Sequence, residues 1–162
     1  MKASATTAQR PALRGSTYFL YPGQVRASQG EGTITTILGT CVAVCLWDGQ
    51  ARVGGVNHYL LAKAPAGESS SPRFGLAAIP LLLEEMLSLG ACKPQLVAKV
   101  FGGMSSQMRG IGTSDIGATN VALAQETLEA LRIPLLTCDV GGARGRKLVF
   151  DIATGNAWVK QL

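Results

Sequence analysis

Charge is scarce in this sequence, and long apolar runs are missing from it. Only 15% of the 162 residues are charged. No stretch approaches the ~18 consecutive apolar residues that a membrane-spanning helix needs. Residues 1–15 include basic side chains but no apolar segment, so they do not have the pattern of a secretory signal. These absences favour a cytoplasmic protein without membrane insertion, in which the cysteines remain reduced thiols.

Histidine is rarer still, since His58 is the only one. The four cysteines do not follow the spacing of a zinc site, so we expect no metal. They are Cys41, Cys45, Cys92 and Cys138. The net charge of +5 favours acidic partners. Because no basic stripe is interleaved with aromatic residues, the sequence argues against nucleic-acid binding.

Glycine and apolar residues are plentiful, with 20 glycines and 47% hydrophobic residues. This composition predicts a real core with many tight turns. We expect a disordered arm over residues 1–15, a single domain over 16–162, and a mixed α/β (α+β) fold with two main helices. The helices are expected over 76–89 and from 116 or 118 to 131, with a loop over 102–117. The strands are expected over 16–21, 33–47 with a break at Gly39, 52–61, 96–101, 133–140, 147–152 and 157–159, and residues 28–32 are expected to form a loop.

Residues 41–61 have the pattern of a β-hairpin that turns at Asp48-Gly49. If the loop has two residues, Cys41 and His58 are diagonal neighbours on one face of the sheet. If it has four, they lie directly opposite each other, and an odd loop or a β-bulge separates them onto opposite faces. With an even loop, the other face receives Val42, Val44, Asn57 and Tyr59, and the apolar members of this set are expected in the core.

A lone histidine or a cysteine in a strand is most often structural, but a Cys–His pair in contact has a definite chemistry. The imidazole takes the thiol proton, and the thiolate attacks a carbonyl carbon. Gly39 and Thr40 precede Cys41 and could turn backbone N–H groups toward the oxyanion. No carboxylate lies near His58 on the hairpin, so a hydroxyl is the available partner for the ring. The candidates are Thr33, Thr35, Thr36 and Thr40.

Two segments resemble the chemoreceptor glutamine deamidase family, CheD. They are TTILGTCVAVC at 35–45 and GVNHYLL at 55–61. The resemblance runs from about Tyr18 to Lys160, and shorter matches continue it through Arg73-Phe74, Ala78-Ile79, 98–103, Ile111-Gly112, Asn120, Gly141-Gly142, 145–147 and Thr154-Gly155. Thr40 departs from the family, which often has serine there, but it keeps the hydroxyl.

The resemblance implies a hydrolase that converts chemoreceptor glutamines into glutamates, and some members also hydrolyse glutamyl methyl esters. Carried over by position, its catalytic residues are Cys41, His58 and Thr35, the threonine six residues before the nucleophile. It implies no cofactor. It also implies a fold similar to the catalytic domain of the cytotoxic necrotizing factor toxins, with mixed β-sheets packed face to face and helices outside.

Partner sites are predicted at two further places. Arg146 and Lys147 are expected to flank the groove that receives a receptor helix rich in Glu and Gln. The region of Phe101, Gly102 and Gly103 and the loop after it resemble the family surface that is docked by the phosphatase CheC. An alternative function is therefore a non-catalytic regulator that docks on such a phosphatase or on a receptor.

Overall fold

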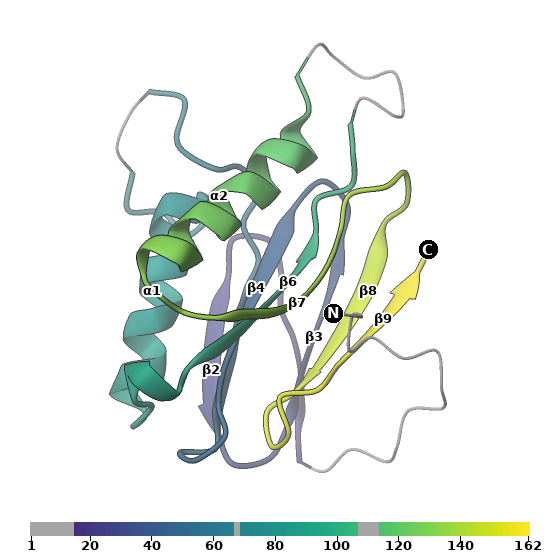
Figure 1. Ribbon diagram of the computed structural model, residues 1–162. Coiled ribbons are helices and arrows are strands. Elements are labelled where there is room, and N and C mark those ends of the chain that lie inside the picture. Colours follow the sequence, from purple (N-terminus) through teal and green to yellow (C-terminus); the bar gives the residue numbers. More distant parts are fainter. Residues whose placement is uncertain (1–14, 67–68, 107–113) are drawn as a thin grey trace.

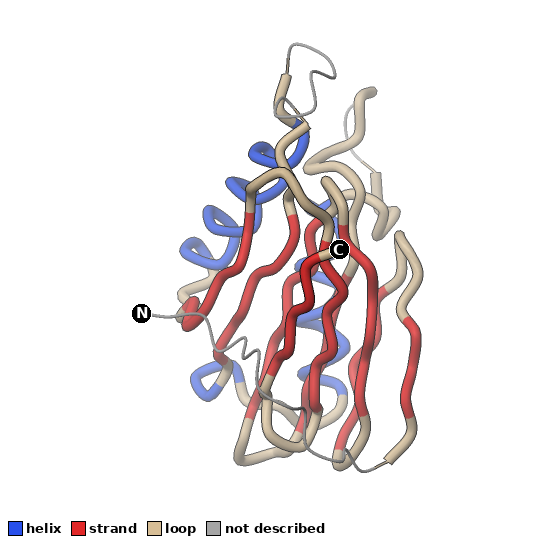
Figure 2. The backbone as a smooth tube through the Cα atoms, turned by 90° about the vertical axis from the view of Figure 1, so that its right-hand side faces the viewer, coloured by secondary structure: helices blue, strands red, loops and turns tan. Residues whose placement is uncertain are grey.

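Two β-sheets and a layer of two helices make up the part of the chain that the computed structural model describes, residues 15–66, 69–106 and 114–162 (Figures 1 and 2). The first sheet has the strand order β1-β3-β8-β9, and the second has the order β2-β5-β4-β6-β7. Residues 1–14 of the predicted arm lie outside the described residues. The same holds for residues 107–113 of the loop that was predicted over 102–117. The elements are β1 (Thr17–Phe19), β2 (Val25–Gln29), β3 (Thr33–Leu38), β4 (Val42–Asp48), β5 (Val53–Asn57), α1 (Gly75–Ser88), the 3₁₀ turn η1 (Lys93–Gln95), β6 (Val97–Gly102), α2 (Ile116–Ala130), β7 (Leu135–Val140), β8 (Arg146–Asp151) and β9 (Ala157–Gln161).

The strand β4 lies in the middle of the second sheet and is buried on both faces. Its sequence is an almost continuous apolar run, as is typical of a strand that is covered on both sides. Val42, Val44 and Leu46 pack with side chains of α1 and α2, whereas Ala43 and Cys45 pack with side chains of the first sheet. The order of layers is therefore sheet, sheet, helices, which confirms the predicted α+β class.

Both helices cover the outer face of the second sheet (Figure 1). Neither helix is long and apolar enough to cross a membrane, and the described residues contain no other helix that is.

The hairpin of β4 and β5 turns one position later than predicted. Its strands close at Asp48 and Val53, so its loop is the four residues 49–52. The carboxylate of Asp48 holds this turn together. Its Oδ1 accepts the N–H groups of Gln50 and Ala51 at 2.9 and 3.0 Å, and its Oδ2 accepts the N–H of Cys92 at 2.8 Å.

The register of the hairpin sets Val42 opposite Tyr59 and Cys45 opposite Val56. His58 is consequently opposite residue 43, and Cys41 is its diagonal neighbour, as expected for an even loop. Val42 and Tyr59 point to the helices, as predicted, so Cys41 and His58 both point toward the first sheet. The directly opposed pairing that was predicted for a four-residue loop is wrong, because the turn begins one residue later.

Candidate active site

Cys41 lies in the loop from β3 to β4, one residue before β4 begins. Its side chain is half-buried and faces a pocket of about 510 Å³. Burial raises the pKa of the Cys41 thiol, and its own backbone N–H offsets part of the rise. The thiol is therefore protonated at neutral pH. The other residues that line this pocket are Thr40, Leu60, Leu61, Pro65, Arg73, Phe74 and Ile116.

His58 directly follows β5 and is buried between the two sheets, with 1% of its surface exposed. Its backbone is fixed by the residues before β2, since the His58 N–H donates to Gln24 O at 3.1 Å and Gly23 N–H donates to His58 O at 2.8 Å. Burial lowers the pKa of His58 to about 4. The imidazole is consequently neutral at pH 7, and a neutral imidazole is a proton acceptor.

The tautomer of His58 follows from its contact with Thr36. The Thr36 Oγ1 lies 2.7 Å from His58 Nδ1 and donates its single proton to Leu20 O, also at 2.7 Å. Because that proton is committed to Leu20, Oγ1 accepts from Nδ1–H, and the lone pair of the ring is on Nε2. Among the described residues Nε2 has no hydrogen-bond partner, although it is fully buried. The lone pair on Nε2 is therefore uncommitted: it has no hydrogen bond to Cys41 Sγ or to any other described atom.

The loop that carries Cys41 is held through its carbonyl groups. Met104 N–H donates to Gly39 O at 2.9 Å, and Gly103 N–H donates to Cys41 O at 2.8 Å. The described chain contains no cis peptide bond, and in a trans peptide the N–H points away from the C=O. The N–H of Thr40 therefore points to the side of the loop that is opposite Met104. Gly39 and Thr40 thus present one oriented donor beside the cysteine.

Gly102 and Gly103 allow this close contact because they have no side chain. A Cβ on Gly102, whose φ is 102°, would lie 2.3 Å from Cys41 O. A Cβ on Gly103 would lie 2.3 Å from a methyl group of Val121 in α2. Both glycines are buried, and Phe101 is 0% exposed in the core between the sheets. Phe101 and Gly102 therefore lie inside the protein and offer no docking surface themselves, whereas Gly103 lines a second pocket of about 250 Å³. Docking of a phosphatase at this region and at the loop that follows it stays a prediction.

A family model described as CheD chemotactic sensory transduction matches residues 60–161 of this chain. This chain belongs to the CheD family.

Proteins similar to this CheD chain carry names that state an activity. One from Anaeromyxobacter dehalogenans, named probable chemoreceptor glutamine deamidase CheD 1, is 49% identical over 144 residues, which cover 89% of this chain and 84% of the relative. One from Trichlorobacter lovleyi, named probable chemoreceptor glutamine deamidase CheD, is 43% identical over 138 residues, which cover 85% and 86%. A third, from Chromobacterium violaceum, is 40% identical over 152 residues, which cover 91% and 78%.

In this CheD chain the threonine that contacts the histidine is Thr36 and not Thr35, which was carried over by counting back from Cys41. The Thr35 hydroxyl donates to Leu148 O at 2.8 Å, and its side chain points to the opposite face of β3. The buried residues Ile34 and Leu38 share the inner face with Thr36. Their apolar side chains two residues before and after Thr36 were the signal in the sequence that identifies it as inward-facing.

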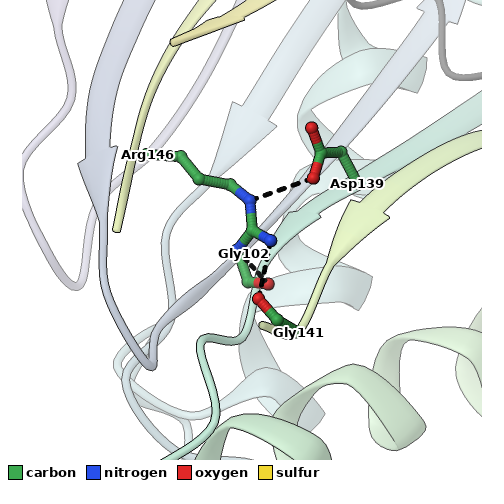
Figure 3. Close-up of polar contacts among 4 residues, drawn as sticks. All are labelled: Gly102, Asp139, Gly141 and Arg146. Carbon is green, nitrogen blue, oxygen red and sulfur yellow. Dashed lines mark hydrogen bonds and ion pairs between the residues drawn. The ribbon is translucent and has the colours of Figure 1, made fainter. Parts of the chain in front are cut away.

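Arg146 does not flank the pocket of Cys41, contrary to the prediction. It is 3% exposed, and its guanidinium bonds Asp139 Oδ1 at 3.1 Å, Gly102 O at 2.9 Å and Gly141 O at 2.7 Å (Figure 3). These contacts join β8 of the first sheet to the ends of β6 and β7 in the second. Lys147, the next residue, is exposed and points to the outer face of the first sheet.

Arg73 is a cation that lines the pocket, and it was not predicted as a site residue beyond its place in the resemblance. Its side chain is exposed, and its backbone O accepts the N–H of Leu60 at 2.8 Å. The described lining of the pocket is therefore mostly apolar and includes the positive charge of Arg73. Within the described residues, no group of three or more His, Cys, Asp and Glu side chains could hold a metal ion.

Proposed function

We propose that this protein deamidates glutamine side chains of chemoreceptors, with Cys41 as the nucleophile, His58 as the general base and Thr36 as the residue that orients the ring. The observation that carries this proposal is the free Nε2 of His58, which the Thr36 contact leaves unprotonated on the face of the hairpin that Cys41 shares. The names of the related CheD proteins supply the reaction and the substrate.

The first half of the reaction begins with two neutral groups. Cys41 Sγ gives its proton to His58 Nε2 as it attacks the carboxamide carbon of the glutamine, so that the charged pair develops during the attack. The oxyanion then receives hydrogen bonds from backbone N–H groups at Thr40 and Cys41. When the tetrahedral intermediate collapses, the proton on Nε2 passes to the departing nitrogen, and ammonia leaves a thioester on Cys41.

The second half consumes water. Neutral His58 takes a proton from a water molecule, the hydroxide attacks the thioester carbon, and the Cys41 sulfur leaves with the proton returned by His58. The products are glutamate and the resting thiol. A glutamyl methyl ester would react through the same thioester, with methanol as the leaving group. No cofactor takes part in these steps.

The burial of His58 suits this cycle. An imidazole with a pKa near 4 does not hold the thiol proton at rest, and it returns the proton readily to a leaving group. The four cysteines are free thiols, as the chemistry of a thiol nucleophile requires. We further propose that the reaction takes place in the cytoplasm, on the cytoplasmic helices of the receptor. A CheC-type phosphatase as a second partner stays a prediction.

The test is to incubate the protein with purified cytoplasmic fragments of chemoreceptors and to measure their mass. Each converted glutamine adds about 1 Da, because the amide is hydrolysed to an acid. Cys41→Ala is the control and should produce no gain. If wild-type protein binds the fragments but leaves their mass unchanged, the docking-regulator alternative replaces the enzyme.

A further inference from the structure

Asn120 of α2 is a buried polar residue that the reaction above does not use. Its side chain is 1% exposed and lies on the inward face of the helix, one and two turns before the buried residues Ala124 and Leu128. A helix face that packs on a sheet is usually apolar. An asparagine on that face needs a reason, because burying an amide is costly unless it forms hydrogen bonds.

Its side-chain nitrogen donates two hydrogen bonds, to Thr40 O at 3.0 Å and to Leu60 O at 2.8 Å. Both partners are carbonyl oxygens, so the atom that faces them must be the nitrogen and both its protons are used. Thr40 directly precedes the nucleophile, and Leu60 follows His58 by two residues. One amide therefore joins the two chain segments that carry the catalytic pair.

The bond to Thr40 has a consequence for Cys41. The peptide that joins Thr40 to Cys41 is trans, so when its C=O points to Asn120 its N–H points the opposite way. That N–H also lies close enough to the Cys41 sulfur to hold down the pKa of the thiol against the effect of burial. Thr40 N–H is oriented in the same manner by the bond from Met104 N–H to Gly39 O. The Cys41 N–H is thus turned away from Asn120, and the Thr40 N–H is turned away from Met104.

We propose that Asn120 is a positioning residue that orients the Cys41 N–H as a donor to the oxyanion. This inference rests on the proposed function for its choice of reaction, but the geometry concerns any attack of Cys41 on a carbonyl carbon. The remaining side-chain atom, Oδ1, is buried without a hydrogen-bond partner in the described part of the chain. The unsatisfied Oδ1 of Asn120 is thus tolerated while its side-chain nitrogen donates to both Thr40 O and Leu60 O.

The test compares two reactions of Cys41 that differ in their need for an oxyanion site. Acylation by a p-nitrophenyl ester passes through a tetrahedral oxyanion, whereas alkylation by iodoacetamide displaces iodide from an sp³ carbon and forms no oxyanion. The ratio of the two rate constants, measured at one pH on intact protein with the modified residue mapped by mass, isolates oxyanion stabilisation from the reactivity of the thiol.

Asn120→Asp keeps the shape of the side chain but can donate at most one hydrogen bond, and Asn120→Ala removes both. We expect each to lower the ratio of acylation to alkylation at least tenfold, and to lower kcat for receptor deamidation more than it changes KM. Ala124→Gly is the matched control. It weakens the same face of α2 one turn further on without removing a bond to the loop, and it should leave the ratio within about twofold of wild type.

Two results would overturn the proposal. An unchanged ratio in the Asn120 variants, whether both rate constants are kept or both fall equally through a general collapse of the site, would show that oxyanion stabilisation does not depend on Asn120. A wild-type protein that is alkylated but never acylated at Cys41 would show that no oxyanion site exists. If the ester acylates wild-type Cys41 while receptor fragments are never deamidated, the proposed function fails and the role of Asn120 is still decided by the ratio.

Discussion

Thr36 Oγ1 and His58 Nδ1 lie 2.7 Å apart, and the bond between them crosses from one β-sheet to the other. Thr36 belongs to β3 of the first sheet, whereas His58 follows β5 of the second. The orientation of the base is therefore set by how the two sheets pack and not by the hairpin that carries Cys41 and His58. A change in the inter-sheet core can thus reach the reaction without touching either residue.

Replacement of Thr36 or Thr35 by valine, which keeps the shape of the side chain and removes the hydroxyl, should have very different effects on kcat for deamidation. Thr36→Val frees the His58 ring to adopt the wrong tautomer, and we expect kcat for deamidation to fall about 10- to 100-fold. Thr35→Val removes a hydroxyl that donates to Leu148 O and has no contact with His58 among the described residues, and kcat should stay within about threefold of wild type. A larger loss in Thr35→Val than in Thr36→Val would restore the threonine that the resemblance implied.

The two cysteines of the hairpin should also differ. Cys41→Ala is expected to abolish deamidation while binding of the receptor fragment persists, because the thiol is half-buried and contributes little to packing. Cys45→Ala should keep most of the activity, since Cys45 is 1% exposed and burial raises its pKa so far that no thiolate forms. Comparable losses in both variants, measured as ammonia released per folded protein, would leave the nucleophile unassigned.

The sequence was sufficient to predict that Cys41 and His58 share a face, because the alternation of side chains in a strand depends only on whether the loop is even. It was not sufficient to predict the register. The loop starts after Asp48 because three backbone N–H groups bind its carboxylate, and one of them, from Cys92, comes from a distant part of the chain. A long-range contact of this kind leaves no local pattern.

The strand β2 was not predicted, for a similar reason. In its sequence, VRASQ, Val25 is the one residue of the β-branched and aromatic types that favour strands, and residues 28–32 were expected to form a loop. It forms because it pairs with β5 along five positions at the edge of the second sheet. The roles of Asn120 and Arg73 were missed because each depends on segments that meet only in the folded chain.

The folded protein should lose stability as His58 is protonated. The pKa of His58 is about 4 in the folded state and near 6.5 when the chain is unfolded, so the unfolded state binds the proton more tightly. The contribution of the lowered His58 pKa to the free energy of unfolding is fully present above pH 6.5 and is lost as the pH falls toward 4. At pH 5 about 2 kcal/mol of it is lost.

Denaturant unfolding at pH 7 and at pH 5 measures this loss, and His58→Gln is the control because carboxyl groups titrate equally in both proteins. The free energy of unfolding of wild type should fall by about 2 kcal/mol more than that of the variant. Parallel decreases in the two proteins would show that His58 is not a buried neutral base.

Substitutions of Arg146 and Lys147 should differ strongly in how much stability they cost. Arg146→Lys cannot reach Asp139, Gly102 and Gly141 together, and the buried carbonyls lose their donors, so we expect a loss of about 2–4 kcal/mol. Lys147→Ala is the matched control at an exposed position and should cost less than about 0.5 kcal/mol. If Arg146→Lys raises KM for the receptor without affecting the free energy of unfolding, Arg146 contacts the substrate after all.

The pH dependence of two reactions of Cys41 should distinguish a neutral resting pair from an ion pair. Burial lowers the pKa of His58 to about 4 and raises that of Cys41 above its ordinary value of 9.0, so both groups are uncharged between these limits. We expect kcat/KM for deamidation to be flat from about pH 5 to 8 and to fall on the acid side with a midpoint near 4, where His58 ceases to be a base.

Alkylation by iodoacetamide requires the free thiolate, so its rate at Cys41 should rise about tenfold per pH unit and continue to rise through pH 9. Mass mapping separates Cys41 from the exposed Cys92 and Cys138, and Cys41→Ala gives their background. A preformed thiolate–imidazolium pair would instead make alkylation of Cys41 independent of pH over the same range, and that result would contradict the two neutral groups from which the proposed reaction starts.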